Sequence, residues 1–267
     1  MSSSPEPRTP WFHQGTDPIT IITLDQPIPS RWKILSKLNE HDHQGTEETR
    51  GRHDHYSYAT LKLLCCDPKK PSNQAFMRIY LQVPTRNTEM QGPQTRSRQA
   101  TKFTPPELTA YQELTRQDFR HVPKLLGYKV STQDKSGLVP GGYAIWLVWE
   151  KVPGLRLAES SNRLANHAYW TLSAVERERI RQAFIEVLPL AYVNGYKPWA
   201  PGLSNLVWHS ESGTLYFIGI HGLMEKRTDR SKFRVGPQML ACFGLVKPSS
   251  KAWLQNDWNG DTTGWER

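Results

Sequence analysis

Four histidines in the first quarter of the chain have the spacing of metal ligands. They form two His-Asp-His triplets, His41 with His43 and His53 with His55. Imidazole and carboxylate groups at such spacing can bind Zn²⁺. The triplets lie in a hydrophilic stretch, residues 39–55, where no obvious outer hydrogen-bond partners are present to orient metal-binding histidines. The sequence therefore favours a solvated, mobile loop over a zinc site.

A second stretch with candidate chemistry runs from Gly195 to Ile220. Its beginning is rich in Pro and Gly, which predicts a loop, and two apolar runs around a tight turn, Asn205–Trp208 and Thr214–Ile220, predict a β-hairpin. Ser204 lacks the G-x-S-x-G surroundings of a hydrolase nucleophile, so we discard hydrolase chemistry. In sequence order, an apolar strand that ends at Glu150 comes first, then a long charged helix, and then the hairpin.

Composition narrows the class of protein. A chain of 267 residues with 37% hydrophobic content can bury a substantial core, and its net charge of +9 favours anionic partners. The basic residues are dispersed, which predicts a solvated basic surface and makes nucleic acid an unfavoured partner. The three cysteines indicate reduced thiols. Without a signal peptide or a transmembrane run, we expect a soluble protein in the cytoplasm or nucleus, with no membrane partner.

Periodicity predicts a strand-rich first half and a helical second half. A helix begins after Thr104, whose side chain suits an N-cap, and a longer one occupies residues 170–190, with Ser173 as its cap. A modest helical segment follows at 236–245, while residues 84–104 are expected to form a polar loop. The expected strands are residues 18–28, 32–38, 56–66, 75–83, 122–130 and 142–149.

Several segments, taken in order, resemble the kinase-like domain of a broad group of fungal proteins. They are MRIYLQVP, PPELTAYQEL, VPKLLGYK, VPGGYAIWLVWEKVPGLRL and LSNLVWHSESGTLYFIG, and the resemblance covers roughly residues 20–245. It implies an α+β, bilobal protein-kinase-like fold, related to the aminoglycoside-phosphotransferase branch. An antiparallel N-lobe sheet with one helix would occupy residues 18–152, and a reduced, mainly helical C-lobe residues 153–250. Residues 1–17 are expected to be disordered, and 251–267 to form a C-terminal tail.

The resemblance also assigns a vestigial nucleotide cleft. Arg78 occupies the place of the lysine that holds the nucleotide phosphates, and Glu107 that of the helix glutamate that pairs with it. Glu150 and Val152 fall at the hinge, where backbone groups would meet an adenine ring. Arg78 and Glu107 could form a relic anion site or an ordinary salt bridge between strand and helix, and we favour the salt bridge.

The same resemblance shows which catalytic groups are missing. Asn205 matches the metal-binding asparagine, but the catalytic base position falls at Ala200 and the metal-binding aspartate position at Ile218, or at Gly219 after a one-residue shift. Phosphoryl transfer depends on a carboxylate that orients the nucleophile and on Mg²⁺ held by charged oxygen atoms. These positions supply neither. We therefore expect Asn205 to brace its loop through hydrogen bonds rather than to bind a metal.

These observations predict a catalytically degenerate kinase-like protein that acts as a binding or scaffolding module, and an accessory role in a fungal pathway is compatible with them. No catalytic or metal-binding residue is assigned. ATP without a metal is a candidate ligand, and an unidentified protein or an anionic small molecule a candidate partner. The alternative is an active small-molecule or protein phosphotransferase with atypical catalytic residues such as Asp229 or Asp257. That alternative predicts ATP turnover that requires a divalent cation.

Overall fold

A computed structural model describes residues 11–267 except 14, 47, 49–55, 160–166, 199 and 224–233, and the side chains of residues 197 and 198. The chain divides into two compact units. We call Met1–Pro105 with Leu125–Lys151 the sheet unit, and Pro106–Lys124 with Val152–Arg267 the hairpin unit. Both units mix helices with antiparallel strands. None of the helices in the described part of the chain is long and apolar enough to cross a bilayer.

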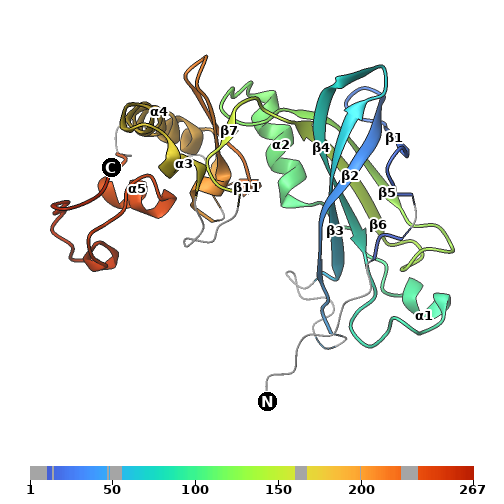
Figure 1. Ribbon diagram of the computed structural model, residues 1–267. Helices are drawn as coiled ribbons and strands as arrows, with labels where there is room; N and C mark the ends of the chain where they lie inside the picture. The colour runs from blue at the N-terminus through green and yellow to red at the C-terminus, as the bar shows by residue number, and fades with distance from the viewer. Residues whose placement is uncertain are drawn as a thin grey trace. The chain divides into compact units, whose positions relative to one another are not determined.

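The sheet unit is built on a six-stranded antiparallel sheet (Figure 1). Its order is β1-β2-β3-β4-β6-β5, and every neighbouring pair is antiparallel. The strands are β1 (Ile21–Leu24), β2 (Ser30–His43), β3 (Tyr58–Asp67), β4 (Lys70–Gln82), β5 (Leu125–Thr132) and β6 (Tyr143–Glu150), and α1 (Pro93–Ser97) lies between β4 and β5 in sequence. The hairpin of β3 and β4 confirms the hairpin predicted within residues 56–83, although β4 begins at Lys70 and not at residue 75.

Alternation of side chains explains why these strands form a sheet with one buried face. Along β3 the residues Ala59, Leu61, Leu63 and Cys65 are each at most 1% exposed, whereas the residues between them are half-buried. Side chains of successive residues in a strand point to opposite faces, so this pattern gathers the apolar set on one side. Met77 of β4, which is fully buried, extends the same core.

The sheet also rolls until its two edges meet. Gln26, just after β1, exchanges two backbone hydrogen bonds with Tyr128 of β5, at 3.1 and 2.8 Å. A Cβ atom at Gly127 would come within 3.0 Å of side-chain atoms of both Leu24 and Ser30, so a residue without a side chain suits this close approach. At this bridge the two edges of the sheet satisfy each other's backbone groups, which an open edge would leave unpaired.

Three segments of the sheet unit are more ordered than the sequence predicts. Strand β2 continues to His43, although a mobile loop was expected from Asn39, because its backbone pairs with β3 up to Tyr58 whatever its side chains are. Phe12 is 6% exposed in the core, which differs from the disorder expected for residues 1–17. The polar stretch after β4 contains α1.

A buried polar network explains the order of that last stretch. Gln99 is 6% exposed, and its side chain accepts a hydrogen bond from the Thr85 N–H at 2.9 Å and donates one to Thr88 at 2.9 Å. Gln82 donates to the Gln99 carbonyl at 2.6 Å. Because buried polar groups are stable only when they are hydrogen-bonded, these side chains fix the path of a segment that has no apolar pattern.

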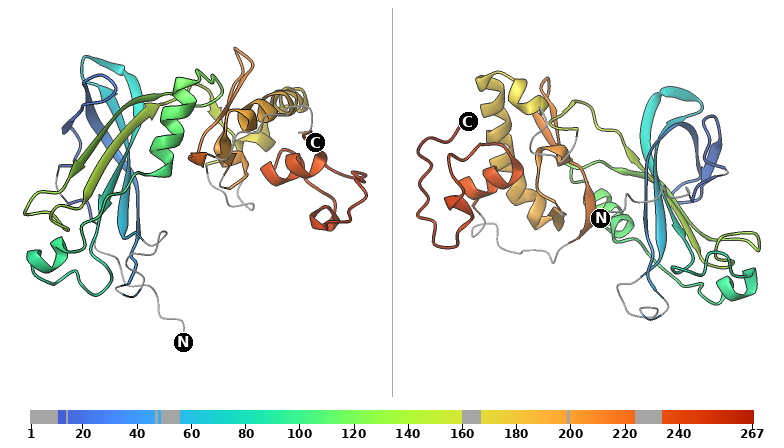
Figure 2. Two further views of the ribbon diagram at one scale, coloured as in Figure 1. Left: turned by 180° about the vertical axis from the view of Figure 1, so that it is seen from behind. Right: turned by 60° about the horizontal axis from the view of Figure 1, so that its bottom comes forward.

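The hairpin unit contains helices and two small sheets (Figure 2). The sheets have the orders β10-β9-β7 and β11-β8. Their strands are β7 (Leu155–Arg156), β8 (Tyr196–Pro198), β9 (Leu206–His209), β10 (Thr214–Phe217) and β11 (Ile220–Leu223). The helices include α2 (Pro106–Arg116), α3 (Ala168–Thr171), α4 (Ala174–Val193) and α5 (Pro237–Phe243), with 3₁₀ turns at Leu203–Asn205 and Ala252–Leu254. The hairpin of β9 and β10 and the helices α2, α4 and α5 were predicted, but the second predicted strand, Thr214–Ile220, ends at Phe217, and Ile220 begins β11 of the other small sheet.

Helix α4 begins where the sequence places its cap. Ser173 accepts a hydrogen bond from the Glu176 N–H at 3.2 Å, which satisfies a backbone donor of the first turn. Its buried stripe includes Ile180, Phe184 and Leu188. The stripe packs in an aromatic cluster in which the ring of Phe184 lies 5.8 Å from Phe217 and 4.8 Å from Phe243. The helix thereby packs against β10 of the hairpin.

Two further contacts distinguish this unit from the arrangement expected. Helix α2 was expected to pack with the preceding sheet, but it groups with the hairpin unit and packs on β11. Segment 251–267, expected as a tail, returns to the chain, since Lys247 and Glu266 exchange two backbone hydrogen bonds and form a 3.0 Å salt bridge. Trp253 in this segment is 8% exposed. The lobe boundaries predicted from the sequence remain a prediction.

Candidate functional site

The loop from Ala200 to Asn205 precedes β9 and is braced by its last residue. The side-chain Nδ2 of Asn205 donates a hydrogen bond to the Ala200 carbonyl at 2.6 Å, across the loop. The backbone carbonyl of Asn205 accepts from the Ile218 N–H at 2.8 Å, which ties the loop to the end of β10. The sequence predicts such bracing, and the structure confirms it. Ala200, Asn205 and Ile218 are thus brought together.

Gly219 fits closely against this brace. Its φ of 72° lies in the left-handed region, which favours glycine, and a Cβ atom there would come within 2.9 Å of Asn205 Cγ and still closer to its Oδ1. The side-chain oxygen of Asn205 therefore packs directly on the Gly219 backbone. An aspartate at 219, the shifted position for a metal ligand, would not fit beside Asn205.

The loop, residues 200–205, is held by backbone contacts and has no carboxylate or imidazole of its own. Ala200 is exposed and Ile218 is half-buried, and neither has an ionisable group. Ser204 is 8% exposed, and its carbonyl accepts a hydrogen bond from Arg156 Nε at 2.9 Å. This guanidinium of β7 therefore supports the loop through its backbone. No carboxylate in the loop can orient a nucleophile or bind a hard cation.

The proposed phosphate-binding residue lies on the face of the sheet opposite to the core. Arg78 of β4 is directly opposite Lys62 of β3, and its guanidinium lies 5.5 Å from the ring of Trp149. Lys62 Nζ lies 4.5 Å from the ring of Phe76. Two cations and two aromatic rings therefore share this face. Sequence reasoning missed Lys62, although the strand register would have placed it beside Arg78.

The other cleft residues are divided between faces and units. Glu150 is opposite Ala75 in the sheet, so its side chain leaves on the face opposite to that of Arg78. Glu107 is 3% exposed in the first turn of α2, and Val152 is half-buried after β6. Both belong to the hairpin unit, whereas Arg78 belongs to the sheet unit. The pairing of Arg78 with Glu107 and the nucleotide-binding role of the five residues remain predictions.

The histidine triplets do not form a metal cluster in the described residues. His41 and His43 are exposed on the same face of β2, and the ring of His43 lies 5.9 Å from that of Tyr58. His53 and His55 lie outside the described residues. No group of three or more metal-binding side chains is present in the parts of the chain that the structure describes.

A separate polar cluster joins α4 to the hairpin, and we call it the α4–hairpin clamp. Trp208 of β9 donates its indole N–H to Glu176, and Arg179 forms a 2.7 Å salt bridge with the same carboxylate. The Arg179 guanidinium lies 5.5 Å from the Trp208 ring and donates to the Ser210 carbonyl at 3.2 Å. The hydrogen bond from Trp208, followed by the contacts of Arg179, lowers the pKa of Glu176.

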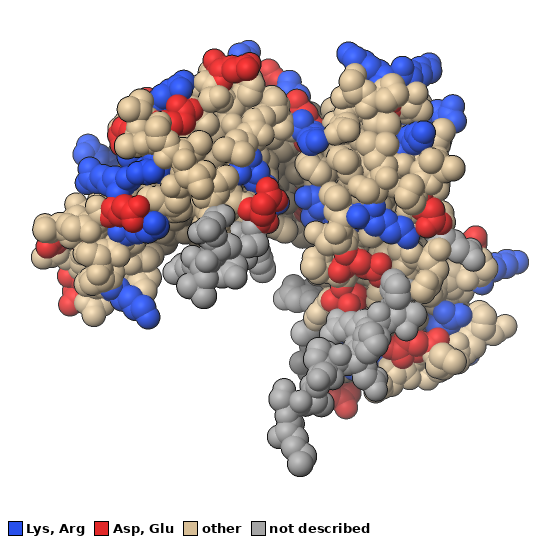
Figure 3. Space-filling view, viewed as in Figure 1, with Lys and Arg blue, Asp and Glu red and all other residues tan. Residues whose placement is uncertain are grey.

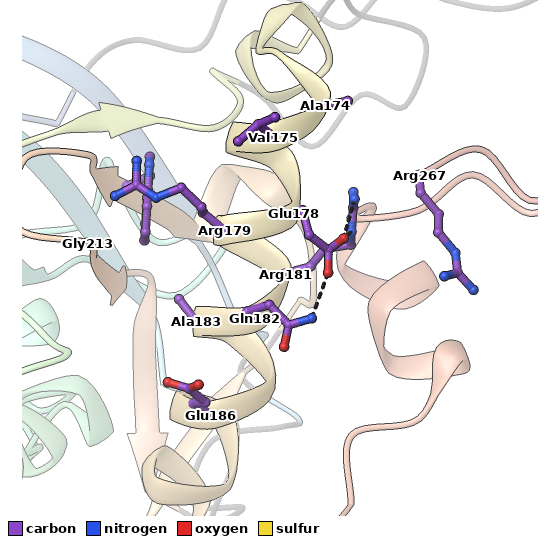
Figure 4. A pocket seen from close by; sticks show the side chains of 11 residues that line it. Ala174, Val175, Glu178, Arg179, Arg181, Gln182, Ala183, Glu186, Gly213 and Arg267 are labelled. Carbon is purple, nitrogen blue, oxygen red and sulfur yellow. Dashed lines mark hydrogen bonds and ion pairs between the residues drawn. The ribbon is translucent and has the colours of Figure 1, made fainter.

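Hollows flank the clamp within the hairpin unit. One has a volume of about 770 Å³ and lies along α4 beside Trp208 and Gly213 (Figure 4). Another, of about 600 Å³, lies between Leu155 of β7, the start of α4 and the turn of the hairpin. Arg179 and Trp208 line both hollows. On the face drawn in Figure 3, basic side chains are interspersed with acidic ones, as the dispersed charges of the sequence predict.

Comparisons with known proteins give only a distant likeness. No protein-family model matches the chain, and no curated protein matches it. The structure of the Cydia pomonella granulovirus kinase PK-1 is 14% identical with a TM-score of 0.37, and the match covers 70% of this chain and 52% of that chain. A chain in the complex of Neurospora crassa PAN2 (WD40-CS1) with PAN3 (pseudokinase and C-term) is 11% identical with a TM-score of 0.33, and the match covers 73% and 41%. This chain spans about half the length of those proteins.

Proposed function

We propose that this chain is a kinase-like protein without phosphotransfer that acts as a binding module. The proposal is carried by one observation: the side chain of Asn205 is engaged by neighbouring residues of the protein itself. Its Nδ2 is bound to the Ala200 carbonyl and its Oδ1 packs on Gly219, so both polar atoms of the side chain hold the loop together. The positions for the base and for the second metal ligand are Ala200 and Ile218, which have no carboxylate. The carboxylates that usually orient the nucleophile and bind the Mg²⁺ that stabilises the phosphates are therefore missing at these positions.

The ligand class of this proposal is a nucleotide or another anionic small molecule, held without a metal, or a protein partner. Lys62 and Arg78 share a face of the sheet unit, beside Phe76 and the buried Trp149, and these two cations favour an anionic ligand because cations attract phosphates. The fungal affiliation and the pathway role rest on the sequence resemblance alone and stay predictions.

The first test is a thermal-shift titration with ATP, ADP and GTP, each with and without Mg²⁺, together with an assay of ATP turnover. A ligand that binds the native state raises the unfolding midpoint. If the ligand is a nucleotide, we expect the unfolding midpoint to rise equally with and without Mg²⁺. If the partner is a protein, we expect no change of the midpoint. A shift that requires Mg²⁺ together with ATP turnover would support an active phosphotransferase and overturn the proposal.

The variant Asn205→Asp separates bracing from metal binding. A carboxylate at 205 cannot donate to the Ala200 carbonyl, and we expect it to lower the free energy of unfolding by about 1–2 kcal/mol without any gain of turnover. Asn194→Asp is the matched control, because Asn194 Nδ2 also donates to a carbonyl, that of Leu190, at 2.8 Å. If the natural protein shows Mg²⁺-dependent stabilisation that Asn205→Asp changes and Asn194→Asp does not, position 205 is a metal site.

A further inference from the structure

One end of the six-stranded sheet presents basic side chains that form no salt bridge with a described residue. We call them the basic tip, and they are Arg31, Lys33, Lys69 and Lys70. Lys33 of β2 is opposite Cys66 of β3, and β3 ends one residue later, so the start of β2 and the β3–β4 turn lie at the same end of the sheet. On the face drawn in Figure 3, Lys and Arg predominate among the charged side chains over this turn. Such a surface attracts anions.

The carboxylates of the sheet unit near the basic tip leave most of its charge uncompensated. Asp67 caps its own turn, since its Oδ1 accepts a hydrogen bond from a backbone N–H of that turn at 2.8 Å. Glu150 is half-buried at the end of β6, and Asp17 is paired with Lys37 at 3.5 Å. Asp25, in the connection from β1 to β2, is exposed. The exposed charges at this end are therefore mostly positive.

Exposed isoleucines lie next to the basic tip. Ile28 is 73% exposed in the connection that leads into β2, and Ile21 of β1 is 40% exposed directly opposite Lys33. Ile19 is 76% exposed, and its N–H donates to the Ile34 carbonyl at 2.9 Å, one residue from Lys33. Large apolar side chains gathered on a surface mark a binding site, and their combination with cations is typical of proteins that bind the membrane interface.

The backbone of Ile19 is strained although its side chain contributes little to the core. Its φ of 72° lies in the left-handed region, which is rare for a β-branched residue. Hydrogen bonds of the next residue fix this conformation: the Thr20 N–H donates to the Asp17 carbonyl at 3.1 Å, and the Thr20 carbonyl accepts from the Ile34 N–H at 2.8 Å. Burial does not explain an isoleucine at a position that favours glycine. Backbone strain of this kind is concentrated at binding sites.

We propose that the basic tip and the three isoleucines bind the surface of an anionic bilayer, with the cations among the lipid headgroups and the isoleucines at the boundary of the acyl chains. Charge complementarity selects an anionic surface. The isoleucines select lipid over nucleic acid, because aliphatic side chains enter hydrocarbon but do not stack on bases as aromatic rings do. The absence of a spanning segment, from which we expected no membrane partner, does not exclude peripheral binding, which needs no such segment. The inference does not depend on the proposed function, since no nucleotide takes part.

The test is co-sedimentation of the full chain with lipid vesicles. One set contains phosphatidylcholine alone, and the other also contains about 30% phosphatidylserine, which makes its surface negative. We expect the chain to bind the phosphatidylserine vesicles only. Because salt screens exposed charges, the partition coefficient should fall by about fivefold or more when the salt concentration rises from about 0.1 M to about 0.5 M.

Substitutions in the basic tip measure the electrostatic part of the binding. Lys33→Glu with Lys70→Glu should lower the partition coefficient by about tenfold or more. The matched control is Lys102→Glu with Lys135→Glu, which changes the net charge equally at exposed positions. The control positions lie near the ends of β4 and β5 that point away from the basic tip, so this variant should bind as the natural chain does.

Substitutions of the isoleucines measure the apolar part. Ile21→Ser with Ile28→Ser should lower the partition coefficient by about tenfold. Leu38→Ser with Met90→Ser, at positions that are 45% and 98% exposed, is the matched control and should leave it unchanged. Ile19→Gly gives a second readout, because glycine adopts a φ of 72° without strain. It should keep or raise the unfolding midpoint and still weaken vesicle binding, which a purely structural role of Ile19 would not do.

Three results overturn the proposal: equal sedimentation with the two kinds of vesicle, no sedimentation with either, or tip and isoleucine variants that bind as their controls do. A labelled single-stranded oligonucleotide is the competing probe. If it binds through the lysines of the tip, while the isoleucine variants bind both probes as the natural chain does, the surface recognises nucleic acid and the proposal is wrong. If Lys33→Glu with Lys70→Glu lowers the unfolding midpoint, Arg31→Glu with Lys69→Glu takes its place at exposed positions. Mg²⁺-dependent ATP turnover with intact vesicle binding would refute the proposed function and leave this surface.

Discussion

The core of the sheet unit and the braced loop of the hairpin unit are stabilised by contacts of different kinds. Along β3 and β4 the same apolar contact recurs at every second residue, so that many side chains specify one register. In the loop, one amide, Asn205, and one residue without a side chain, Gly219, specify the path. We infer that the sheet tolerates the loss of one contact with its geometry intact, whereas the loop changes its geometry when one atom is added.

The largest expected effect belongs to the sheet. Met77→Ala removes a fully buried side chain from the core, and we expect it to lower the free energy of unfolding by about 3 kcal/mol, from lost burial and the cavity that remains. Leu38→Ala, at a position that is 45% exposed on β2, is the control and should cost well under 1 kcal/mol. Urea denaturation measures both. Hydrogen exchange should show that the backbone hydrogen bonds of β4 persist in the Met77→Ala variant. Their loss would mean that the register of the sheet depends on this one side chain.

The next effect concerns the loop. Gly219→Ala adds a Cβ atom that meets Asn205 at a residue with φ of 72°, and we expect a loss of about 2 kcal/mol. Gly260→Ala is matched to it, because Gly260 has φ of 87° and nothing within 4 Å of the added atom. The difference between the two variants isolates the contact with Asn205. Equal costs would mean that the backbone conformation alone matters and that the brace does not depend on this contact.

The same contrast explains how much of the fold could be predicted from the sequence. The strands β3 and β4 and the helix α4 follow from long alternating or helical patterns and from the cap at Ser173. The extension of β2 to His43 carries no apolar signal, because backbone pairing rather than burial holds it. The closure of the sheet between Gln26 and Tyr128 joins residues about a hundred positions apart, and no local pattern encodes such a bond.

The candidate site was predicted only where its residues are close in sequence. Asn205 and Ala200 are five residues apart, and their hydrogen bond follows from the preference of Asn for bracing turns. Lys62 beside Arg78 needs the register of β3 on β4, which pairs them across the hairpin. The clamp joins Glu176 to Trp208 across 32 positions, and only the packing of α4 on the hairpin brings them together.

A smaller effect depends on pH and concerns the clamp. The pKa of Glu176 is lowered by Trp208 and Arg179, so its ionised form stabilises the fold above the ordinary pKa of a glutamate, and this contribution is lost as pH falls through the lowered value. Glu176→Gln keeps an acceptor for Trp208 but cannot ionise. We expect it to cost about 1 kcal/mol at pH 7 and progressively less as pH falls through the lowered pKa of Glu176. Urea midpoints at several pH values measure this, with Glu186→Gln as the control. A cost that is independent of pH would mean that the charge of Glu176 does not contribute.

The smallest effect is expected at Tyr196, in the aromatic cluster that supports the hairpin. Its side chain is fully buried, its ring lies 5.2 Å from Phe217, and its hydroxyl has no hydrogen-bond partner among the described residues. Burial also raises the pKa of this hydroxyl. Since an unsatisfied buried hydroxyl costs free energy, we expect Tyr196→Phe to leave stability unchanged or to raise it by up to about 1 kcal/mol. Tyr169→Phe is the contrasting control, because the Tyr169 hydroxyl donates to the Leu245 carbonyl at 2.8 Å and accepts from Arg181 at 2.9 Å. If Tyr196→Phe costs as much as Tyr169→Phe, the Tyr196 hydroxyl has a partner in solution, and the support of the hairpin is polar as well as apolar.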